Sequence, residues 1–321
     1  MQGGGFPLCF IYLFMKWTEE QIPSQEGRII VVTGANSGLG YYTTRALARK
    51  GARVIMACRS QERGEEARKK IISQGALVEP ELEELDLASL ESVRAFAGRL
   101  SETGRIPHVL VNNAGLMAIP YDKTRDGFEM QFGVNHLAHF ALTALLWPGM
   151  KSLEGARIVQ VSSLAHRWGT IRYEDPHWDL DYKKWGAYGM SKLANLLFTY
   201  ELSRRLEDSG AGCRVVAAHP GYADTSLQAK SMRMAGSEGK AGLFTLVNRL
   251  VAQPGWKGAL PSLYAASADE ARSGAFYGPS GMLRLHGWPR EELPHGKRVN
   301  ATDASRLWEL SEKLTGMVLV P

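Results

Sequence analysis

Short runs of β-branched and apolar residues recur along the chain and alternate with longer segments of helical character. Apolar runs without polar alternation are typical of strands that are buried on both faces of a parallel sheet. Such strands are predicted at residues 28–33, 53–58, 82–85, 108–112, 157–162 and 214–219, with a short seventh at 275–277. Helices are predicted between them at residues 39–50, 61–74, 90–100, 128–146 and 187–206.

This alternation of strands and helices predicts an α/β fold with parallel βαβ units, in one doubly wound domain. The domain is expected to span residues 27–321, after an N-terminal extension at residues 1–26. The fourth helix should end before Pro148, because proline cannot donate to a helix. Residues 225–257 interrupt the alternation and carry apolar side chains among glycines, so we expect them to form a mobile lid over the substrate.

The composition is that of a globular protein, with 45% hydrophobic and 22% charged residues in a chain of 321. The net charge is +5, and the longest basic block, at residues 68–70, is short enough to be a solvated helix face. No nucleic-acid partner is therefore expected. His136 and His139 form an HxxH pair, but no acidic residue or cysteine stands at ligand spacing, so no metal site is predicted.

The cysteines are odd in number and show no CxxC spacing: Cys9, Cys58 and Cys213. This pattern argues against a disulfide framework and indicates a reducing compartment, hence a cytoplasmic location.

Residues 6–15 form an uncharged apolar stretch. A membrane span needs about 20 apolar residues, and a secretory signal would begin with basic residues, so neither explains it. The stretch could be a shallow interfacial anchor, a disordered tail, or sequence upstream of a natural start at Met15. We favour the last interpretation, with peripheral membrane association as the alternative.

A glycine-rich turn, TGANSGLG, joins the first predicted strand to the first predicted helix. Gly34 permits the tight turn, Gly38 lets backbone amides approach a pyrophosphate at the helix N-terminus, and Gly40 allows close packing of helix on sheet. The turn therefore predicts dinucleotide binding. The expected contacts in it are Gly34, Asn36, Ser37, Gly38, Leu39 and Gly40.

The end of the second strand bears on the choice of dinucleotide. An acidic residue there would bind the ribose 2′-hydroxyl of NAD, but the sequence is Cys58-Arg59-Ser60. Arg59 can pair with a 2′-phosphate, so NADP(H) is the predicted cofactor and NAD(H) the alternative. Asp86 and Leu87 follow the third strand, where a carboxylate could meet the adenine amino group.

The fourth strand is followed by a second small-residue turn, in which Asn113, Ala114 and Gly115 are expected to contact the cofactor. It lies at the carboxyl edge of the predicted sheet, where ligands bind in open parallel sheets.

Tyr188 and Lys192 stand four residues apart in a predicted helix and therefore share one helix face. The ammonium of Lys192 is expected to lower the pKa of the Tyr188 phenol, which would make it a general acid and base. Ser163 follows the fifth strand and could hold a substrate oxygen beside Tyr188; no GxSxG elbow supports a serine nucleophile. Asn135 could hold a water that links Lys192 to solvent, or it could be a helix-bending asparagine with a satisfied amide.

The motifs TGANSGLG, NNAG, YGMSK and HPGYADT, taken in order, resemble the short-chain dehydrogenase/reductase family. The segments ACRSQERGEEA, SKLANLLFTYEL and RLWELSEKLTG are similar to its retinol-dehydrogenase-like branch. The resemblance implies a seven-stranded parallel Rossmann sheet with flanking helices, a helix beyond the core near the C-terminus, and dimers, tetramers or monomers. It also implies a catalytic tetrad of Asn135, Ser163, Tyr188 and Lys192.

In that family the lysine also binds the nicotinamide ribose, and Pro220, Gly221 and Thr225 match a segment near the carboxamide. The separation of Ser163 from Tyr188 is about twice the usual one, because residues 168–185 form an insert that this branch often carries.

The leading hypothesis is an NADP-dependent oxidoreductase for a hydrophobic aldehyde, ketone or alcohol, such as a retinoid, steroid or lipid carbonyl. One alternative is a nucleotide-sugar epimerase or dehydratase, which shares the tyrosine and lysine but has a longer C-terminal domain and a different glycine spacing. The other is a cofactor-sensing regulator without turnover, in which a broken tetrad would be expected.

Overall fold

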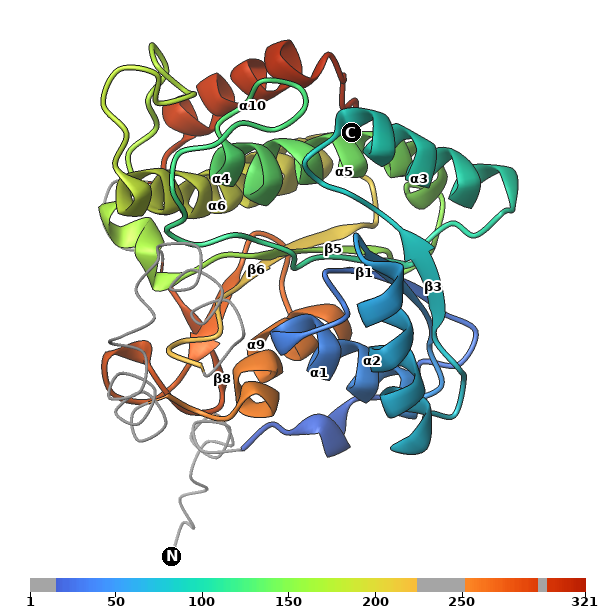
Figure 1. The fold of residues 1–321 in the computed structure, drawn as a ribbon. Helices are drawn as coiled ribbons and strands as arrows, with labels where there is room; N and C mark the ends of the chain where they lie inside the picture. The colour runs from blue at the N-terminus through green and yellow to red at the C-terminus, as the bar shows by residue number, and fades with distance from the viewer. Residues whose placement is uncertain (1–15, 224–251, 294–298) are drawn as a thin grey trace, which may run out of the picture.

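The centre of the computed structural model, which describes residues 16–223, 252–293 and 299–321, is one eight-stranded sheet (Figure 1). The strand order is β3-β2-β1-β4-β5-β6-β7-β8. The strands are β1 (Ile29–Thr33), β2 (Arg53–Cys58), β3 (Glu81–Glu84), β4 (Val109–Asn112), β5 (Arg157–Val161), β6 (Arg214–Ala218), β7 (Phe276–Pro279) and β8 (Pro289–Glu292). The strand order reverses between β1 and β4: β2 and β3 lie on one side of β1, and β4 and the later strands lie on the other. At such a switch point the carboxyl ends of the two neighbouring strands flank a crevice.

Seven of these strands, β1 to β7, match the predicted strands and run parallel. The expected number of seven is wrong, because an eighth strand, β8, pairs antiparallel with β7. The sequence of β8 is PREE. An edge strand needs no continuous apolar run, because one side of it faces solvent. The pattern of hydrophobic residues therefore gave no signal for β8.

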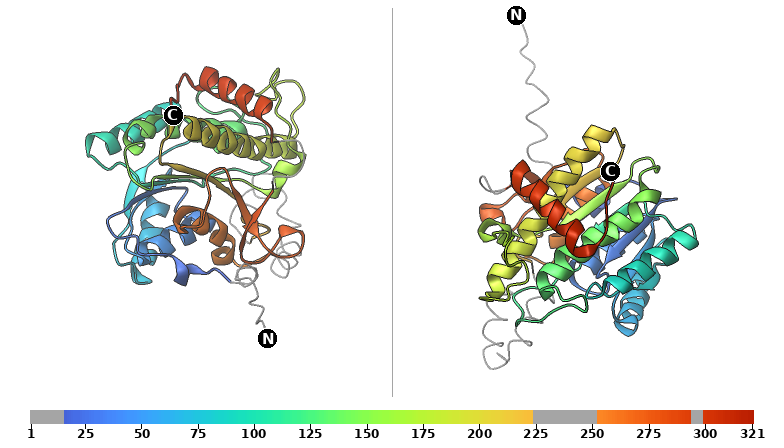
Figure 2. Two further views of the ribbon diagram at one scale, coloured as in Figure 1. Left: turned by 180° about the vertical axis from the view of Figure 1, so that it is seen from behind. Right: turned by 90° about the horizontal axis from the view of Figure 1, so that it is seen from above.

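Helices cover both faces of the sheet in two layers (Figures 1 and 2). On one face lie α1 (Gly38–Arg49), α2 (Gln61–Ser73) and α9 (Gly255–Ser267). On the other lie α3 (Leu90–Glu102), α4 (Met130–Phe132), α5 (Ala138–Met150), α6 (Lys184–Ser209) and α10 (Ala301–Thr315). The last of these, α10, was expected from the resemblance, and it packs on the outer side of α6 and α5.

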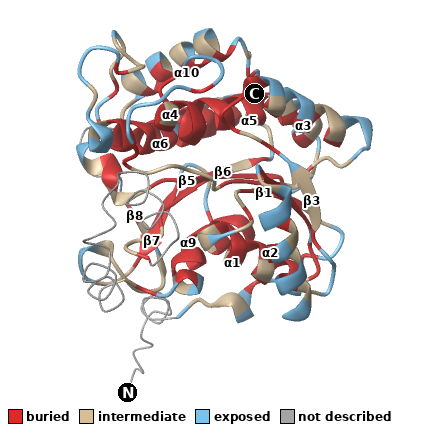
Figure 3. Cartoon of the chain, in the orientation of Figure 1, coloured by how far each residue is buried: buried red, intermediate tan, exposed pale blue. Residues whose placement is uncertain are grey.

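Alternation of side chains along the strands builds a core on each side of the sheet (Figure 3). Val31 belongs to the core beneath α3, α5 and α6, and its neighbour Val32 belongs to the core beneath α1 and α9. Both valines are fully buried. Strands with two buried faces are rich in apolar residues, which is why the sequence pattern revealed them.

The helix predicted at residues 128–146 is instead a series of three segments: α4, a π-helical turn at Gly133–Leu137, and α5. The expected end before Pro148 is wrong, because α5 continues through Pro148 to Met150. Pro148 is exposed and lies in the last turn of α5, so its missing N–H costs the helix a hydrogen bond only near its end. A proline in the last turn is therefore tolerated.

Helix α9 was not predicted from the sequence. Its first turn, residues 255–257, falls within the segment predicted to be a lid, so that end of the predicted lid is wrong. The sequence obscures this helix, since Gly258 and Pro261 lie inside it. A side chain at Gly258 would meet the Cβ of Ala223 at 2.5 Å, so close packing explains the glycine. Residues 224–251 of the predicted lid, Thr225 among them, lie outside the described residues, as do residues 1–15.

The described part of the N-terminal segment packs on the domain, so the folded unit begins before residue 27. The ring of Trp17 makes an edge contact with Tyr264 at 5.2 Å. Arg45 of α1 pairs with Glu19 at 2.8 Å, and Ile22 is buried. Within the described residues, no helix combines the length and the apolar character that a membrane span requires.

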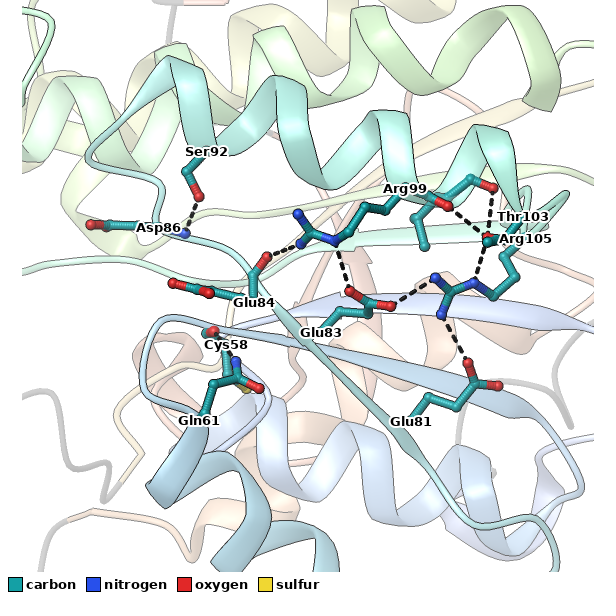
Figure 4. Close-up of polar contacts among 11 residues, drawn as sticks. Cys58, Gln61, Glu81, Glu83, Glu84, Asp86, Ser92, Arg99, Thr103 and Arg105 are labelled. Carbon is teal, nitrogen blue, oxygen red and sulfur yellow. Dashed lines mark hydrogen bonds and ion pairs between the residues drawn. The ribbon is translucent and has the colours of Figure 1, made fainter.

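A network of ion pairs holds the edge strand β3 beside α3 (Figure 4). Glu83 pairs with Arg99 of α3 at 3.1 Å and with Arg105 at 2.7 Å, and Arg105 also pairs with Glu81 at 3.1 Å. These carboxylates explain how a strand of sequence ELEE forms part of the sheet. Beyond β3 the backbone N–H of Asp86 donates to Ser92 Oγ at 2.9 Å, which fixes the loop that carries the Asp86 carboxylate.

Candidate active site

A cavity of about 1330 Å³ opens at the carboxyl ends of the parallel strands. Its lining brings together most of the residues predicted from the sequence: Gly34, Asn36, Ser37, Gly38, Leu39, Arg59, Asp86, Leu87, Asn113, Ala114, Gly115, Ser163, Tyr188, Lys192, Pro220 and Gly221. Gly40 and Asn135 lie outside the lining, but each contacts a residue of it: Gly40 packs against Gly34, and Asn135 is hydrogen-bonded to Leu116. The position of Thr225 is outside the described residues.

The glycine-rich turn leaves β1 with Gly34 at φ +66°, a backbone conformation that favours glycine. Helix α1 then begins at Gly38, so its first backbone N–H groups lie at the cavity wall. A side chain at Gly40 would collide with the carbonyl oxygen of Gly34 and lie 2.6 Å from Asn113 Nδ2. The turn can therefore present a helix N-terminus to a pyrophosphate at close range.

The second turn is tied to the first through Thr33. The Oγ1 atom of Thr33 accepts hydrogen bonds from the backbone N–H groups of Asn113 and Ala114, both at 2.9 Å. The amide of Asn113 returns a bond to the Thr33 carbonyl at 2.7 Å. A side chain at Gly115 would lie 3.1 Å from Asn135 Oδ1 and 3.4 Å from Lys192 Nζ. The bare backbone of these turns thus fits close approach of a dinucleotide.

His139 completes this connection and was not identified as a site residue from the sequence. Its Nε2 lies 2.9 Å from Thr33 Oγ1, and its Nδ1 lies 3.1 Å from the carbonyl oxygen of Asn135. Burial lowers the pKa of His139 to about 4, so the ring is neutral at physiological pH. His136, the other histidine of the HxxH pair, bonds to Ser311 of α10 at 2.9 Å.

Asn135 lies in the π-helical turn, and its amide is fully hydrogen-bonded. Its Oδ1 accepts from the backbone N–H of Leu116 at 2.7 Å, and its Nδ2 donates to the Leu116 carbonyl at 2.9 Å and to Ser191 Oγ at 2.8 Å. This arrangement matches the second of the two sequence-based alternatives, a satisfied amide where the helix departs from α geometry. The side chain fixes the backbone just beyond the second turn.

Tyr188 and Lys192 lie on the buried face of α6, with exposed fractions of 6% and 3%. The ammonium nitrogen of Lys192 lies 5.8 Å from the centre of the Tyr188 ring and donates to the Val161 carbonyl at 3.1 Å. Ser163, which follows β5, forms a side-chain hydrogen bond with Tyr188. The phenol, the hydroxyl and the ammonium group therefore meet at one wall of the cavity.

The electrostatics of this wall correct one expectation. Burial raises the pKa of Tyr188 to about 12, and the hydrogen bond from Ser163 only partly offsets this effect. Burial also lowers the pKa of Lys192 to about 8. Desolvation of the phenol thus outweighs the neighbouring ammonium, and Tyr188 holds its proton at neutral pH instead of being acidified by Lys192. The arrangement is suited to donating a proton to an incoming oxygen.

The two ends of the cavity differ in character. One end is lined mainly by basic side chains, Arg59 together with Arg63 and Lys70 of α2, with the carboxylate of Glu66 also in the lining. Arg63 and Lys70 were not predicted; a signal was available, since Arg63 follows Arg59 by four residues, at the start of a helix. Asp86 and Leu87 line the same cavity.

The other end is mostly apolar and includes Leu164, Trp168, Trp185, Leu283 and Leu285, with Arg167 as a charged member of the lining. The ring of Trp185 meets Tyr188 edge-on, with ring centres 6.2 Å apart. Trp168 and Trp185 bound the insert between Ser163 and Tyr188, so the insert furnishes part of this wall.

The match to known proteins is extensive. A model of the short chain dehydrogenase family covers residues 28–236. The chain belongs to the short-chain dehydrogenase family. Retinol dehydrogenase 14 of Homo sapiens is 42% identical over 91% of this chain and 87% of its own. The short-chain dehydrogenase assignment and the retinol-dehydrogenase-like character predicted from the sequence are thereby confirmed.

Solved structures agree with this assignment. The structure of an uncharacterized protein from Mycobacterium Paratuberculosis is 42% identical in sequence and superposes with a TM-score of 0.77. The match spans 95% of this short-chain dehydrogenase and 99% of that protein's chain. A structure named as an NAD(P) dependent gluconate 5-dehydrogenase from Beutenbergia cavernae, with bound NADP, is 26% identical. Its TM-score is 0.57, with coverage of 77% and 92%. The chain is thus an oxidoreductase that binds NAD(P) and interconverts an alcohol and a carbonyl.

Proposed function

We propose that the chain is an NADP-dependent reductase of hydrophobic carbonyl compounds, in which Tyr188 is the general acid. The observation that carries this proposal is the meeting of Tyr188, Ser163 and Lys192 at one wall of a cavity whose opposite ends are basic and apolar. The basic end suits a 2′-phosphate, and the apolar end suits a hydrophobic substrate. The names of the relatives, retinol dehydrogenases 11 to 14, are compatible with such a substrate.

In this mechanism the substrate carbonyl oxygen lies between the hydroxyl groups of Ser163 and Tyr188. A nicotinamide cofactor held by the glycine-rich turn and by Asn113, Ala114 and Gly115 would supply the hydride that reduces the carbonyl carbon. Tyr188 donates its proton to the oxygen as negative charge develops there, and Ser163 donates a hydrogen bond to the same oxygen. The ammonium of Lys192, 5.8 Å from the ring, stabilises the phenolate that remains. Alcohol oxidation follows the same steps in reverse.

The regulator alternative predicts cofactor binding without turnover, while the epimerase or dehydratase alternative predicts turnover of a nucleotide sugar. A panel of aldehydes and ketones, followed by the absorbance of NADPH, distinguishes these from the proposal. We expect consumption of NADPH with apolar carbonyl compounds. Turnover confined to small charged sugars would contradict the proposed substrate class.

Replacing Arg59 with alanine is expected to weaken NADPH binding by about ten- to hundredfold and to leave NADH binding within about twofold. Arg59 lines the basic end of the cavity, and a charge-assisted hydrogen bond to the 2′-phosphate is worth roughly one to two factors of ten in affinity. NADH lacks this phosphate. Titration of both cofactors against wild-type and Arg59→Ala protein, followed by fluorescence, measures the difference.

Arg94 of α3 provides the matched control, because it is exposed and lies outside the cavity lining. Arg94→Ala should bind both cofactors as the wild type does. Equal losses for NADPH and NADH in Arg59→Ala would show that Arg59 does not read the 2′-phosphate.

Replacing Trp185 with alanine tests the apolar end of the cavity. The side chain is 49% exposed and covers one side of Tyr188. We expect the KM of a large apolar aldehyde to rise about 5- to 20-fold, since loss of apolar contact area weakens binding by this amount. The KM of acetaldehyde should be unchanged. Trp256→Ala, outside the cavity lining, is the control; equal effects on both aldehydes in Trp185→Ala would argue against an apolar subsite.

A further inference from the structure

A buried histidine and glutamate lie directly behind one wall of the cavity, outside the catalytic group. His219 follows β6 and is fully buried, and Glu292 of β8 is 9% exposed. His219 Nε2 and Glu292 Oε1 are hydrogen-bonded across β7. Gly278 of β7 leaves the space for this contact, because a Cβ there would collide with both side chains. The pair joins the parallel sheet to the antiparallel strand at its edge.

The contacts of His219 fix the position of its proton. The carboxylate of Glu292 can only accept, so Nε2 carries the proton and donates to it. In the neutral ring Nδ1 then has a free lone pair, and the backbone N–H of Gly221 donates to it at 3.1 Å. The Nε of Arg284 lies 3.7 Å from the second carboxylate oxygen, so positive charge faces Glu292 from the far side.

The bond to Gly221 holds a turn that lines the cavity. Pro220, Gly221 and Tyr222 all belong to the lining, and Gly221 has φ +66°. The same turn is also held from the C-terminal part of the chain, where the backbone N–H of Gln253 donates to the Tyr222 carbonyl at 2.9 Å. The Tyr222 N–H donates to the Leu285 carbonyl at 2.9 Å, and Gln253 Nε2 donates to the Pro220 carbonyl at 2.6 Å.

We propose that Glu292 and His219 are positioning residues for this turn: Glu292 sets the tautomer of His219, and His219 Nδ1 fixes Gly221 against the cavity. The edge strand β8 thereby shapes the site. The expected effect on NADPH affinity rests on the function proposed above, whereas the effect on the turn itself does not.

The test compares His219→Ala with His219→Asn. Alanine removes both hydrogen bonds of the ring. An asparagine side-chain oxygen can accept from the backbone N–H two residues ahead, as in an Asx turn, which is the spacing of His219 and Gly221. Asparagine is too short to reach Glu292, so both variants lose that contact and should show similar falls in Tm. Only alanine leaves the Gly221 N–H without its acceptor.

Two readouts are measured on the full-length protein. Amide hydrogen exchange at Gly221, followed without cofactor, is expected to be at least about tenfold faster in His219→Ala and within about twofold of wild type in His219→Asn. The dissociation constant of NADPH should rise about 5- to 20-fold in the alanine variant and stay near the wild-type value in the asparagine variant. Equal changes in the two variants, or no change in His219→Ala, would overturn the proposal.

If His219→Ala does not fold, Glu292→Gln tests whether Glu292 and His219 position the turn at Gly221. An amide can donate to Nε2 as well as accept from it, so it no longer dictates the tautomer. Exchange at Gly221 should then exceed the wild-type rate, and a wild-type rate would overturn the proposed role of Glu292. If the wild-type protein binds no NADPH, the proposed function fails, but hydrogen exchange without cofactor still tests the pair.

Discussion

Replacement of Tyr188 with phenylalanine is expected to reduce carbonyl turnover by about 10²- to 10⁴-fold and to leave NADPH affinity within about twofold. General acid catalysis contributes roughly 10²–10⁴-fold to a rate, and phenylalanine removes only the hydroxyl group. The ring should keep its edge contact with Trp185 and its place beside Lys192. The loss should therefore appear in kcat and not in cofactor binding.

Single-turnover rates under saturating NADPH, together with a fluorescence titration of NADPH, separate chemistry from binding. Tyr200→Phe is the matched control, because Tyr200 lies on the same helix but outside the cavity lining. Turnover by Tyr188→Phe at more than about a tenth of the wild-type rate would remove Tyr188 from the role of general acid. Loss of NADPH binding in this variant would assign the tyrosine to the cofactor site instead.

The parts of the fold that the sequence predicted are those in which burial dictates residue type. β1 has neighbours on both sides and helices on both faces, so it is a short run of mostly apolar residues. β8 has solvent at one edge, and its charged sequence carries no such requirement. α9 contains glycine and proline that its packing tolerates, so local propensity pointed away from a helix.

Only part of the candidate site could be predicted from the sequence, namely the residues whose positions follow from the order of the strands. Residues at the ends of parallel strands are gathered by the topology, so Gly34 and Ser163 could be placed in one cavity from their positions in sequence. His139 and the pair His219–Glu292 could not, because their partners depend on tertiary contacts between distant segments. No sequence spacing relates Thr33 to His139.

The raised pKa of Tyr188 also depends on tertiary packing, which the spacing of residues in the sequence does not reveal. The spacing of four residues correctly placed Lys192 beside the phenol, but it contains no information on desolvation. Burial of both groups depends on the packing of α6 under the cavity. That burial raises the pKa of Tyr188 to about 12 and lowers that of Lys192 to about 8, which opposes the effect expected from charge alone.

Replacement of Lys192 with methionine is expected to reduce kcat by about 10²- to 10³-fold and to abolish one pH dependence of the reaction. Methionine matches the lysine stem in length but carries no charge. The Val161 carbonyl that Lys192 bonds also receives a hydrogen bond from Asn195 Nδ2 at 3.1 Å, so the variant leaves it with a donor. What is lost is the positive charge beside the ring of Tyr188.

The direction of the pH dependence follows from the two pKa values. Lys192, with a pKa of about 8, is charged below pH 8 and loses its proton above it, whereas Tyr188, with a pKa of about 12, stays protonated across the measured range. Reductive kcat/KM measured from pH 6 to pH 10 should therefore decline above about pH 8 in the wild type and be flat over this range in Lys192→Met. Lys184→Met, an exposed position at the start of α6, should retain the wild-type profile. A wild-type rate that is flat to pH 10, or an unchanged decline in Lys192→Met, would show that the Lys192 charge does not support proton transfer.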